Sequence, residues 1–328
     1  MRVMINGFGR IGRTVLRAWL RGDWPAVQIV AINDIAPAET CAYLLEYDSV
    51  FGPLAGGVGV ANGALTVAGH CLPLTREADL SVMDLTGIDL ILECTGKADA
   101  RDVATRGLRA GAGRVLISGP SEAADVTLVL GANEATLRPE HRVVSNASCT
   151  TNALAPLVRV LDDAFGVSAG WMTTIHCYTG SQPTVDAPRS ADLARNRAAA
   201  LSMVPTTTSA GVLMDRVLPD IAGRIECAAV RVPTASVSAV DLCVVPKQTV
   251  SAEAVNALLL QAGGVIGCTH RPLVSSDLRA RPESIVMALP ETRVTGGGLL
   301  RVFGWYDNEW GFSCRVLDMA TIMGRELS

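Results

Sequence analysis

The sequence lacks three features that would place it in a specialised class of protein. Its nine cysteines include no CxxC pair, which disfavours a disulfide framework or a zinc site and favours a reducing compartment. No apolar stretch is long enough to cross a bilayer, and residues 1–6 enter a strand at once, without the apolar core of a signal peptide. The net charge is only −4, so nothing in the charge favours binding to nucleic acid or to an anionic membrane. We therefore expect a cytoplasmic protein that holds no metal.

The first half of the chain alternates apolar strands with helical patterns. With 328 residues, of which 49% are hydrophobic, the chain is long enough for two domains with large cores. Alternation of this kind is typical of a doubly wound, mostly parallel sheet that is covered on both faces, the Rossmann type of α/β domain. A glycine-rich stretch at residues 52–63 predicts a loop with a small hairpin. Strands are predicted at Arg2–Ile5, Val27–Ile32, Ile88–Leu92, Arg114–Ile117, Val126–Leu130 and Arg142–Val144, and helices after Gly9 and over Ala100–Arg109.

Residues 7–12, with the sequence GFGRIG, lie between the first strand and the first helix. In this position Gly7 permits a tight turn, Gly9 lets the backbone approach a pyrophosphate, and Gly12 lets the helix pack on the strand. The start of the helix then supplies an anion site. Asp34 ends the second strand, where a carboxylate can bind ribose hydroxyls and would repel a 2′-phosphate. The pattern predicts a dinucleotide site that favours NAD over NADP.

Ligands of such sheets bind beyond the carboxyl ends of the strands. Thr95 and Gly96 follow one predicted strand, and Ser118 follows the next. These three residues are candidates for cofactor contacts, although ordinary loop residues would fit the same positions.

The second half of the chain has strands without helices between them, which indicates an α+β domain with an antiparallel or mixed sheet that is open on one face. Residues 180–203 are long, polar and irregular, and loops of this kind are usually functional. A helix is expected at Ser251–Gln261, and strands at Trp171–Tyr178, Arg224–Val232, Val237–Val245, Ile285–Leu289, Thr292–Val294 and Leu299–Trp305.

Cys149 lies at a junction between a strand and a helix, where free N–H groups at the helix start favour a thiolate. Pro156 falls inside the helical pattern, so the helix either kinks there or starts later than Cys149. His176 on a later strand is the natural general base for such a thiol, although alone it would fit a core histidine. Arg231 ends an apolar strand, where an arginine is costly unless it is paired or faces a ligand.

Several motifs together resemble one family. They are residues 6–13 (NGFGRIGR), 33–34 (ND), 47–49 (YDS), 93–96 (ECTG), 145–152 (SNASCTTN), 231–234 (RVPT) and 305–309 (WYDNE). With these motifs in this order, the chain resembles the phosphorylating glyceraldehyde-3-phosphate dehydrogenases from end to end.

This resemblance implies a role for each candidate residue. Cys149 would be the nucleophile and His176 its base. NAD would be held by Gly7, Gly9, Arg10, Ile11, Gly12, Asp34, Thr95, Gly96, Ser118 and Asn308. Inorganic phosphate would be held by Ser148, Thr150, Thr208 and Ser209, and the substrate phosphate by Thr179, Arg231 and Arg195.

The resemblance also implies an organisation and a reaction. Residues 1–148, with a C-terminal helix at 308–328 that packs back on them, would bind the cofactor, and residues 149–307 would form the catalytic domain. A loop at about 178–203, the S-loop of the family, would pack between the subunits of a homotetramer. The glycolytic reaction would oxidise glyceraldehyde 3-phosphate to 1,3-bisphosphoglycerate with NAD and inorganic phosphate, through a hemithioacetal and a thioester on the cysteine.

Some positions depart from the family pattern, and other functions stay open. Gly180 and Ser181 replace an Asn-Asp pair, Ser209 replaces a glycine, and Ala187 replaces a leucine that helps exclude NADP. An erythrose-4-phosphate dehydrogenase would use the same thiol and cofactor but hydrolyse the thioester, and a relative that uses arsenate is also possible. A non-catalytic NAD-binding regulator is disfavoured by the Cys149 and His176 pair, and a cysteine hydrolase without a cofactor by the dinucleotide motif.

Overall fold

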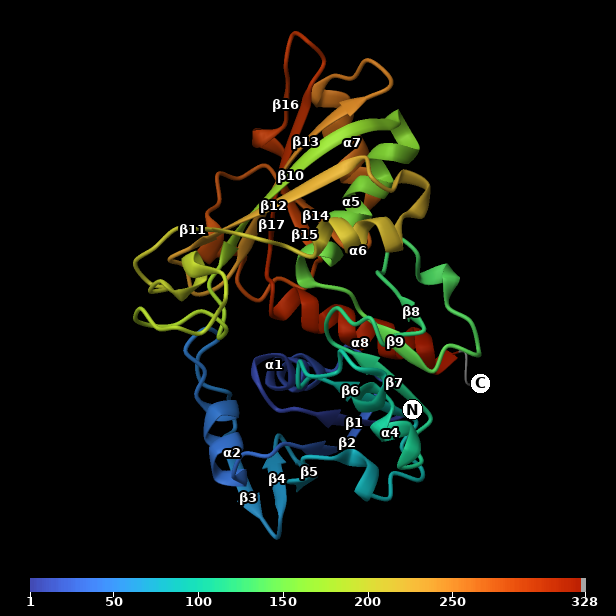
Figure 1. The fold of residues 1–328 in the computed structure, drawn as a ribbon, viewed down its shortest axis with the longest axis vertical. Helices are drawn as coiled ribbons and strands as arrows, with labels where there is room; N and C mark the ends of the chain where they lie inside the picture. Colours follow the sequence, from blue (N-terminus) through green and yellow to red (C-terminus); the bar gives the residue numbers. More distant parts are fainter. Residues whose placement is uncertain (326–328) are drawn as a thin grey trace. The chain divides into compact units, whose positions relative to one another are not determined.

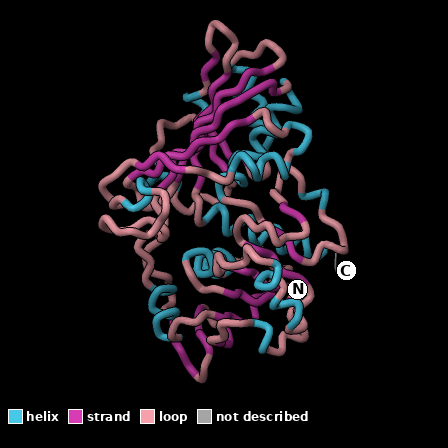
Figure 2. The backbone as a smooth tube through the Cα atoms, in the orientation of Figure 1, coloured by secondary structure: helices cyan, strands magenta, loops and turns pink. Residues whose placement is uncertain are grey.

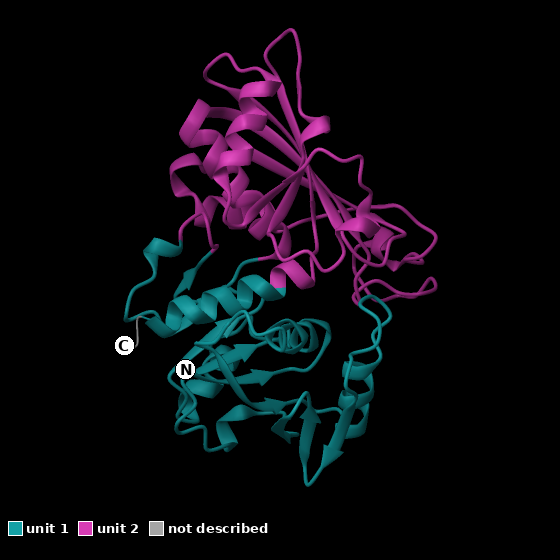
Figure 3. Cartoon of the chain, turned by 180° about the vertical axis from the view of Figure 1, so that it is seen from behind, with its two compact units in different colours: residues 1–128, 134–147, 313–328 teal, residues 129–133, 148–312 magenta. Residues whose placement is uncertain are grey.

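The computed structural model describes residues 1–325, which form two compact units (Figure 3). Unit 1 contains Met1–Leu128, Glu134–Ala147 and the chain from Ser313 onward. Unit 2 contains Val129–Asn133 and Ser148–Phe312. The helix predicted at 308–328 corresponds to α8 (Trp310–Arg325), and residues 326–328 lie outside the described part of the chain.

Unit 1 is built on a nine-stranded sheet with the order β3-β4-β5-β2-β1-β6-β7-β9-β8 (Figure 1). The strands from β5 to β8 in this order pair in parallel, and only β3, β4 and β5 pair antiparallel. The prediction of a doubly wound, mostly parallel sheet is therefore confirmed. The strands are β1 (Arg2–Asn6), β2 (Gln28–Asn33), β3 (Val58–Ala61), β4 (Ala64–Val67), β5 (His70–Thr75), β6 (Leu90–Glu93), β7 (Arg114–Ile117), β8 (Val126–Thr127) and β9 (Val143–Ser145).

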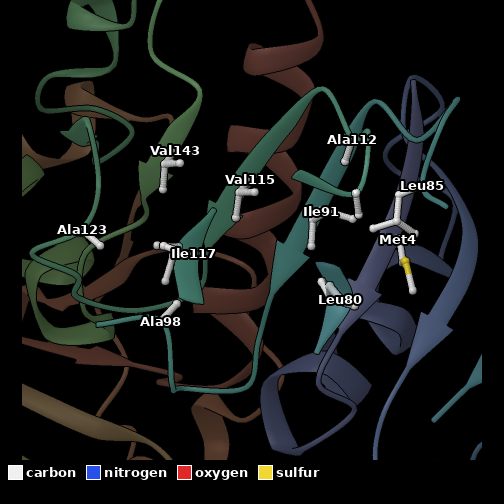
Figure 4. Packing of buried hydrophobic residues seen from close by; sticks show 12 residues of the cluster. Met4, Leu80, Leu85, Ile91, Ala98, Ala112, Val115, Ile117, Ala123 and Val143 are labelled. Atoms are coloured by element: carbon white, nitrogen blue, oxygen red, sulfur yellow. The ribbon is translucent and has the colours of Figure 1, made fainter. Parts of the chain in front are cut away.

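The parallel strands of unit 1 are covered on both faces, and their buried side chains form its hydrophobic core. Figure 4 shows side chains of β1, β6, β7 and β9 that pack in one cluster, among them Met4, Ile91, Val115 and Val143. Leu80, in the short 3₁₀ helix Leu80–Val82, belongs to the same cluster. Burial of this kind stabilises a core by about 25 cal/mol for each Å² of apolar surface removed from water.

The helices of unit 1 are α1 (Arg10–Trp19), α2 (Ala38–Glu46), α3 (Arg101–Ala104), α4 (Arg106–Arg109) and most of α8. The single helix predicted at Ala100–Arg109 was wrong, because the structure has two short helices that meet at Thr105. The Thr105 hydroxyl donates to the carbonyl oxygen of Arg101 at 2.8 Å, and Arg109 donates to that of Asp102 at 3.0 Å. Side-chain donors that compete for helix carbonyls bend or interrupt a helix.

The hairpin expected near residues 52–63 is present, but it is formed by β3 and β4 and extends to Val67. Its two turn residues, Asn62 and Gly63, have φ angles of 50° and 73°. This is the left-handed conformation that tight hairpin turns require and that Asn-Gly pairs readily adopt. The strand predicted at Val126–Leu130 is shorter than expected and ends at Thr127.

Unit 2 is built on an eight-stranded sheet with the order β11-β12-β10-β13-β17-β15-β14, and β16 pairs with β17. The pairs β10–β12 and β14–β15 are parallel and the others are antiparallel, so the predicted mixed sheet is confirmed. The strands are β10 (Val167–Cys177), β11 (Val204–Thr206), β12 (Ile225–Val232), β13 (Ser238–Pro246), β14 (Ile266–Thr269), β15 (Ile285–Ala288), β16 (Arg293–Val294) and β17 (Leu300–Tyr306).

Three helices cover one face of this sheet (Figure 2): α5 (Cys149–Phe165), α6 (Ala210–Val217) and α7 (Ala252–Ala262). Val240, Leu242 and Val244 of β13 are fully buried, as their shared face predicted. Trp171 and Ile175 of β10 are exposed on the opposite side. Within residues 178–203 the structure has only the 3₁₀ helix Leu193–Asn196, so this loop is irregular as expected. Among the described residues, no helix has the length and apolar content needed to span a membrane.

Candidate active site

Cys149 is the first residue of helix α5 in unit 2. Ser148 is the N-cap residue, and its hydroxyl accepts a hydrogen bond from the N–H of Thr151 at 3.0 Å. Helix α5 begins at Cys149 and contains Pro156, so the alternative in which the helix starts later than Cys149 is excluded. The thiol therefore faces the positive end of the helix dipole, which favours its thiolate.

Ala147, directly before the cap, has a φ angle of 53°. This left-handed conformation is uncommon for a residue with a Cβ atom. The Ala147 N–H donates to the Ser145 hydroxyl at 3.1 Å, which holds the bend in place. The chain thus turns sharply between β9 and α5, at the residues that precede the thiol.

His176, near the end of β10, lies with its Nε2 3.7 Å from the Sγ of Cys149. The other ring nitrogen, Nδ1, is 2.6 Å from the carbonyl oxygen of Cys177. A carbonyl oxygen can only accept, so Nδ1 must carry the proton and Nε2 is left with a lone pair. This is the tautomer in which an imidazole can take the proton of a thiol.

The surroundings of the pair shift both pKa values. Burial lowers the pKa of His176 to about 4, with a further contribution from the positive charge of Arg231. The free imidazole is therefore neutral near pH 7. Burial raises the pKa of the Cys149 thiol, whereas hydrogen bonding from Thr150 and the charge of Arg231 lower it. The thiol is thus protonated until a base accepts its proton, and His176 is the group in position to do so.

Arg231 lies beside His176 because β12 pairs with β10 in a register that aligns these two residues. Its guanidinium donates to the Cys177 carbonyl at 3.2 Å and to the Thr179 hydroxyl at 3.0 Å. Burial lowers the pKa of Arg231, and the positive charge of Arg195 also lowers it. A guanidinium and a hydroxyl in this arrangement can hold an anion.

The hydroxyls of the other predicted phosphate-binding residues have different hydrogen-bond partners. The Ser148 hydroxyl caps α5, and the Thr150 hydroxyl lies 2.9 Å from the Oη of Tyr306. Thr208 accepts a hydrogen bond from the Ala210 N–H at 3.2 Å, and Ser209 is the N-cap residue of α6 and exposed. Helix α6 packs against α5, but among the described residues no hydrogen bond joins Thr208 or Ser209 to Cys149.

Unit 1 has a cavity of about 430 Å³ at the carboxyl ends of β1, β2 and β6. Four of the predicted cofactor residues line it: Gly7, Gly9, Asp34 and Thr95. The sequence prediction missed other lining residues, among them Asn6, Asn33, Glu77, Leu80, Lys97 and Arg106. Asn6 and Asn33 end β1 and β2, so their positions at strand ends could have identified them.

The glycines of the first turn have the geometry that a dinucleotide site needs. Gly7 has a φ angle of 91°, and a Cβ atom there would lie 2.6 Å from the Thr95 nitrogen. A Cβ atom on Gly12 would lie 2.1 Å from the Gly7 carbonyl oxygen, whereas Gly9 faces open space. No side chain caps α1 at its N-cap residue, Gly9, and the start of a helix is a favourable place for an anion.

Polar groups complete this cavity. The Asp34 carboxylate accepts from the Phe8 N–H at 2.6 Å and from the Ala36 N–H at 2.8 Å. A carboxylate has about four acceptor sites, so it can still bind ribose hydroxyls. The Asn6 amide donates to Glu93 at 2.5 Å, and Asn33 donates to Asn6 at 2.8 Å. The cavity therefore fits a dinucleotide.

The remaining predicted cofactor residues do not line the cavity. Arg10 pairs with Asp48, and Ser118 donates to the Glu93 carbonyl at 3.1 Å. Gly12 and Ile11 belong to α1, and Gly96 follows β6 with a φ angle of 68°. Asn308 belongs to unit 2, where its Oδ1 accepts from the Cys177 thiol at 3.1 Å.

Comparisons with known proteins agree with this geometry. Residues 1–101 match the glyceraldehyde 3-phosphate dehydrogenase NAD binding domain, and residues 148–308 match the C-terminal domain of the same family. The chain is 47% identical to a glyceraldehyde-3-phosphate dehydrogenase of Xanthobacter flavus, which covers 99% of both chains. It is 46% identical to that of Cereibacter sphaeroides, over 100% of this chain and 99% of the other. It is 42% identical to glyceraldehyde-3-phosphate dehydrogenase 1 of Bacillus subtilis, over 99% of both chains.

Both family domains match, and these relatives cover nearly the whole chain at more than 40% identity. The cofactor is accordingly NAD, and the chain is a dehydrogenase. The protein belongs to the glyceraldehyde 3-phosphate dehydrogenase family.

Proposed function

We propose that the protein oxidises glyceraldehyde 3-phosphate with NAD and couples the oxidation to inorganic phosphate, giving 1,3-bisphosphoglycerate. The observation that carries the proposal is the approach of the Cys149 thiol to within 3.7 Å of a histidine nitrogen that holds a lone pair. The names of the relatives support the same substrate. A glycolytic role follows from this reaction.

The reaction begins at the thiol. His176 accepts the Cys149 proton on Nε2, and the thiolate adds to the aldehyde carbon to give a hemithioacetal. The Cys149 N–H at the start of α5 is positioned to stabilise the oxyanion. His176 returns its proton to this oxyanion, and then accepts the hydroxyl proton of the hemithioacetal as the carbon gives up a hydride and becomes a thioester. Phosphate attacks this thioester, the thiolate leaves, and the acyl phosphate is released.

The cofactor supplies one element of this chemistry, because NAD accepts the hydride when it is bound. We infer that Gly7, Gly9 and the start of α1 hold its pyrophosphate, and that Asp34 binds the adenosine ribose. Asn308 is the expected partner of the nicotinamide carboxamide. In this assignment residues 1–148, with the segment 308–328, form the cofactor domain, and residues 149–307 form the catalytic domain.

The two phosphate groups need separate anion sites. We assign the substrate phosphate to Arg231, Thr179 and Arg195, which bring together two positive charges and a hydroxyl beside the thiol. Inorganic phosphate is assigned to residues at the starts of α5 and α6, namely Ser148, Thr150, Thr208 and Ser209, where helix N–H groups favour an anion.

The protein is also proposed to work in the cytoplasm as a homotetramer. All nine cysteines are free, which suits a reducing compartment. The loop at 178–203 exposes Val185, Leu193, Leu201 and Met203, and exposed apolar side chains in such number are typical of a surface that another subunit covers. This loop is the expected contact between subunits.

Initial rates of NADH formation test the proposed reaction. With glyceraldehyde 3-phosphate and NAD, we expect turnover that requires phosphate or arsenate, since the thioester needs an acceptor. Rates with erythrose 4-phosphate provide the comparison. A rate that is independent of phosphate, or faster with erythrose 4-phosphate, would contradict the assigned reaction.

A further inference from the structure

Tyr306, the last residue of β17, connects the element that carries the thiol to the element that carries the base. Its Oη lies 2.9 Å from the Thr150 Oγ1 and 2.8 Å from the Thr174 Oγ1. All three side chains are buried. The Tyr306 ring meets the His176 ring edge-on, with 6.0 Å between the centroids and 77° between the planes.

The two threonines explain why this position matters. Thr150 follows Cys149 in the first turn of α5. Thr174 precedes His176 by two residues on β10, so both side chains point to the same face of the sheet. The hydroxyl of Tyr306 is therefore the shared partner of a residue next to the thiol and of a residue next to the base.

The phenol of Tyr306 keeps its proton, because burial raises its pKa and the nearby Cys149 raises it further. One phenolic proton can go to at most one of the two threonines, so Tyr306 accepts a hydrogen bond from the other. The three hydroxyls therefore form one continuous chain from the start of α5 to β10, and hydrogen bonds in such a chain polarise one another.

We propose that Tyr306 is a positioning residue, which holds the start of α5 against β10 and thereby sets the approach of the Cys149 thiol to His176. This proposal deepens the proposed function, since it assumes that the Cys149 thiolate is the reactive group. The role depends on the phenolic hydroxyl, because the ring alone would pack equally well as phenylalanine.

The test uses the full-length protein and the variants Tyr306→Phe and Thr174→Val. The rate of Cys149 alkylation by iodoacetamide is measured from pH 5 to pH 10 without substrate or cofactor, with Cys149→Ser identifying the modified thiol. We expect each variant to move the midpoint of this profile upward by about 0.5 to 1 pH unit, since loss of the bridging hydrogen bond leaves the thiol less well placed against the base that accepts its proton. At pH 7, kcat should fall about 3- to 10-fold while KM for the aldehyde stays within twofold.

Thr173→Val is the matched control. It makes the same substitution one residue earlier on β10, where the hydroxyl accepts from Trp171 on the opposite face of the sheet. The midpoint and kcat of this variant should equal those of the wild type. The double variant Tyr306→Phe with Thr174→Val should show little more than the single effect, because both changes interrupt one chain of hydroxyls.

The outcomes separate this role from a structural one and from the proposed function. If Tyr306→Phe and Thr174→Val lower the melting temperature but leave the alkylation midpoint unchanged, the positioning role is wrong. A wild-type protein that makes no NADH would contradict the proposed function. The alkylation profile would still decide the role of Tyr306, because it requires no turnover.

Discussion

At the scale of single residues, the most informative feature is the tautomer of His176. The Cys177 carbonyl fixes the ring proton on Nδ1, and Nε2 is thereby directed to the thiol as an acceptor. The partner of Nδ1 is a backbone carbonyl and not a carboxylate. The imidazole is therefore oriented towards the thiol by the backbone of β10.

Replacing Cys149 with serine should abolish dehydrogenase activity. A serine hydroxyl is a much weaker nucleophile than a thiolate, and His176 alone cannot lower its pKa far enough. NADH formation at saturating aldehyde, NAD and phosphate measures the effect. Turnover within tenfold of the wild type would reject covalent catalysis at this residue.

Burial of His176 should make stability depend on pH. Its pKa of about 4 in the folded protein lies below the ordinary value near 6.5, so the unfolded chain binds the proton more readily between these values. The contribution of His176 to the free energy of unfolding is therefore fully present above pH 6.5 and is lost as the pH falls towards 4. When the pH is lowered from 7 to 5, protonation of this histidine in the unfolded chain should reduce the free energy of unfolding by about 2 kcal/mol.

Urea unfolding of the wild type and of His176→Gln at pH 7 and pH 5 checks this contribution. The variant should lose less stability than the wild type over the same interval, because its amide does not titrate. Equal losses in the two proteins would mean that His176 is not the group responsible.

At the scale of elements, the start of α5 combines a structural and a chemical role. The Ser148 hydroxyl caps this helix, just as the Ser251 hydroxyl caps α7 by accepting from the Ala254 N–H at 3.2 Å. Ser148→Ala and Ser251→Ala should each reduce the free energy of unfolding by about 1 kcal/mol. Only Ser148→Ala should also slow Cys149 alkylation, because only that cap orders the turn that carries the thiol. An equal alkylation rate in both variants would show that the cap does not influence the thiol.

Elements also show where prediction from the sequence succeeds. The strand, glycine turn and helix of residues 2–19 were predictable because a glycine motif and two hydrophobic periods coincide. β11 and α6 were not predicted: β11 has only three residues and contains Pro205, which an edge strand tolerates, and α6 has eight residues and contains Gly211. Short elements of this kind are stabilised by neighbours distant in the sequence, so local pattern carries little information about them.

The candidate site was predictable to a similar degree. Cys149 and His176 stood out as residue types and from the family motifs, and the structure brings them together. Tyr306 lies in the motif at 305–309, but its role could not be predicted, because that role depends on two hydroxyls that are 132 and 156 residues away in the sequence. The lining residues Asn6 and Asn33 were missed because an asparagine at a strand end is also a common turn residue.

At the scale of the whole molecule, the exposed loop at 178–203 predicts how copies of the chain associate. Leu201 and Met203 are 85% and 73% exposed, and replacing both with aspartate should place charges on the surface that we propose contacts another subunit. Sedimentation velocity should then detect a smaller species than the wild-type assembly. Val82→Asp is the control, since Val82 is 71% exposed but lies outside the loop. An unchanged sedimentation coefficient in the loop variant would contradict this contact.

The Cys177 carbonyl accepts hydrogen bonds from both His176 and Arg231, so the base and an anion-binding residue share one peptide group. The charge of Arg231 also lowers the pKa of the imidazole. An anion that rests on Arg231 cancels part of that charge, and by Coulomb's law it makes the imidazole a stronger base. The same charge lowers the pKa of the Cys149 thiol, so a bound anion would make the thiol a weaker acid while it makes the imidazole a stronger base. The two shifts oppose each other, so the transfer of the proton depends less on what occupies Arg231 than either pKa does.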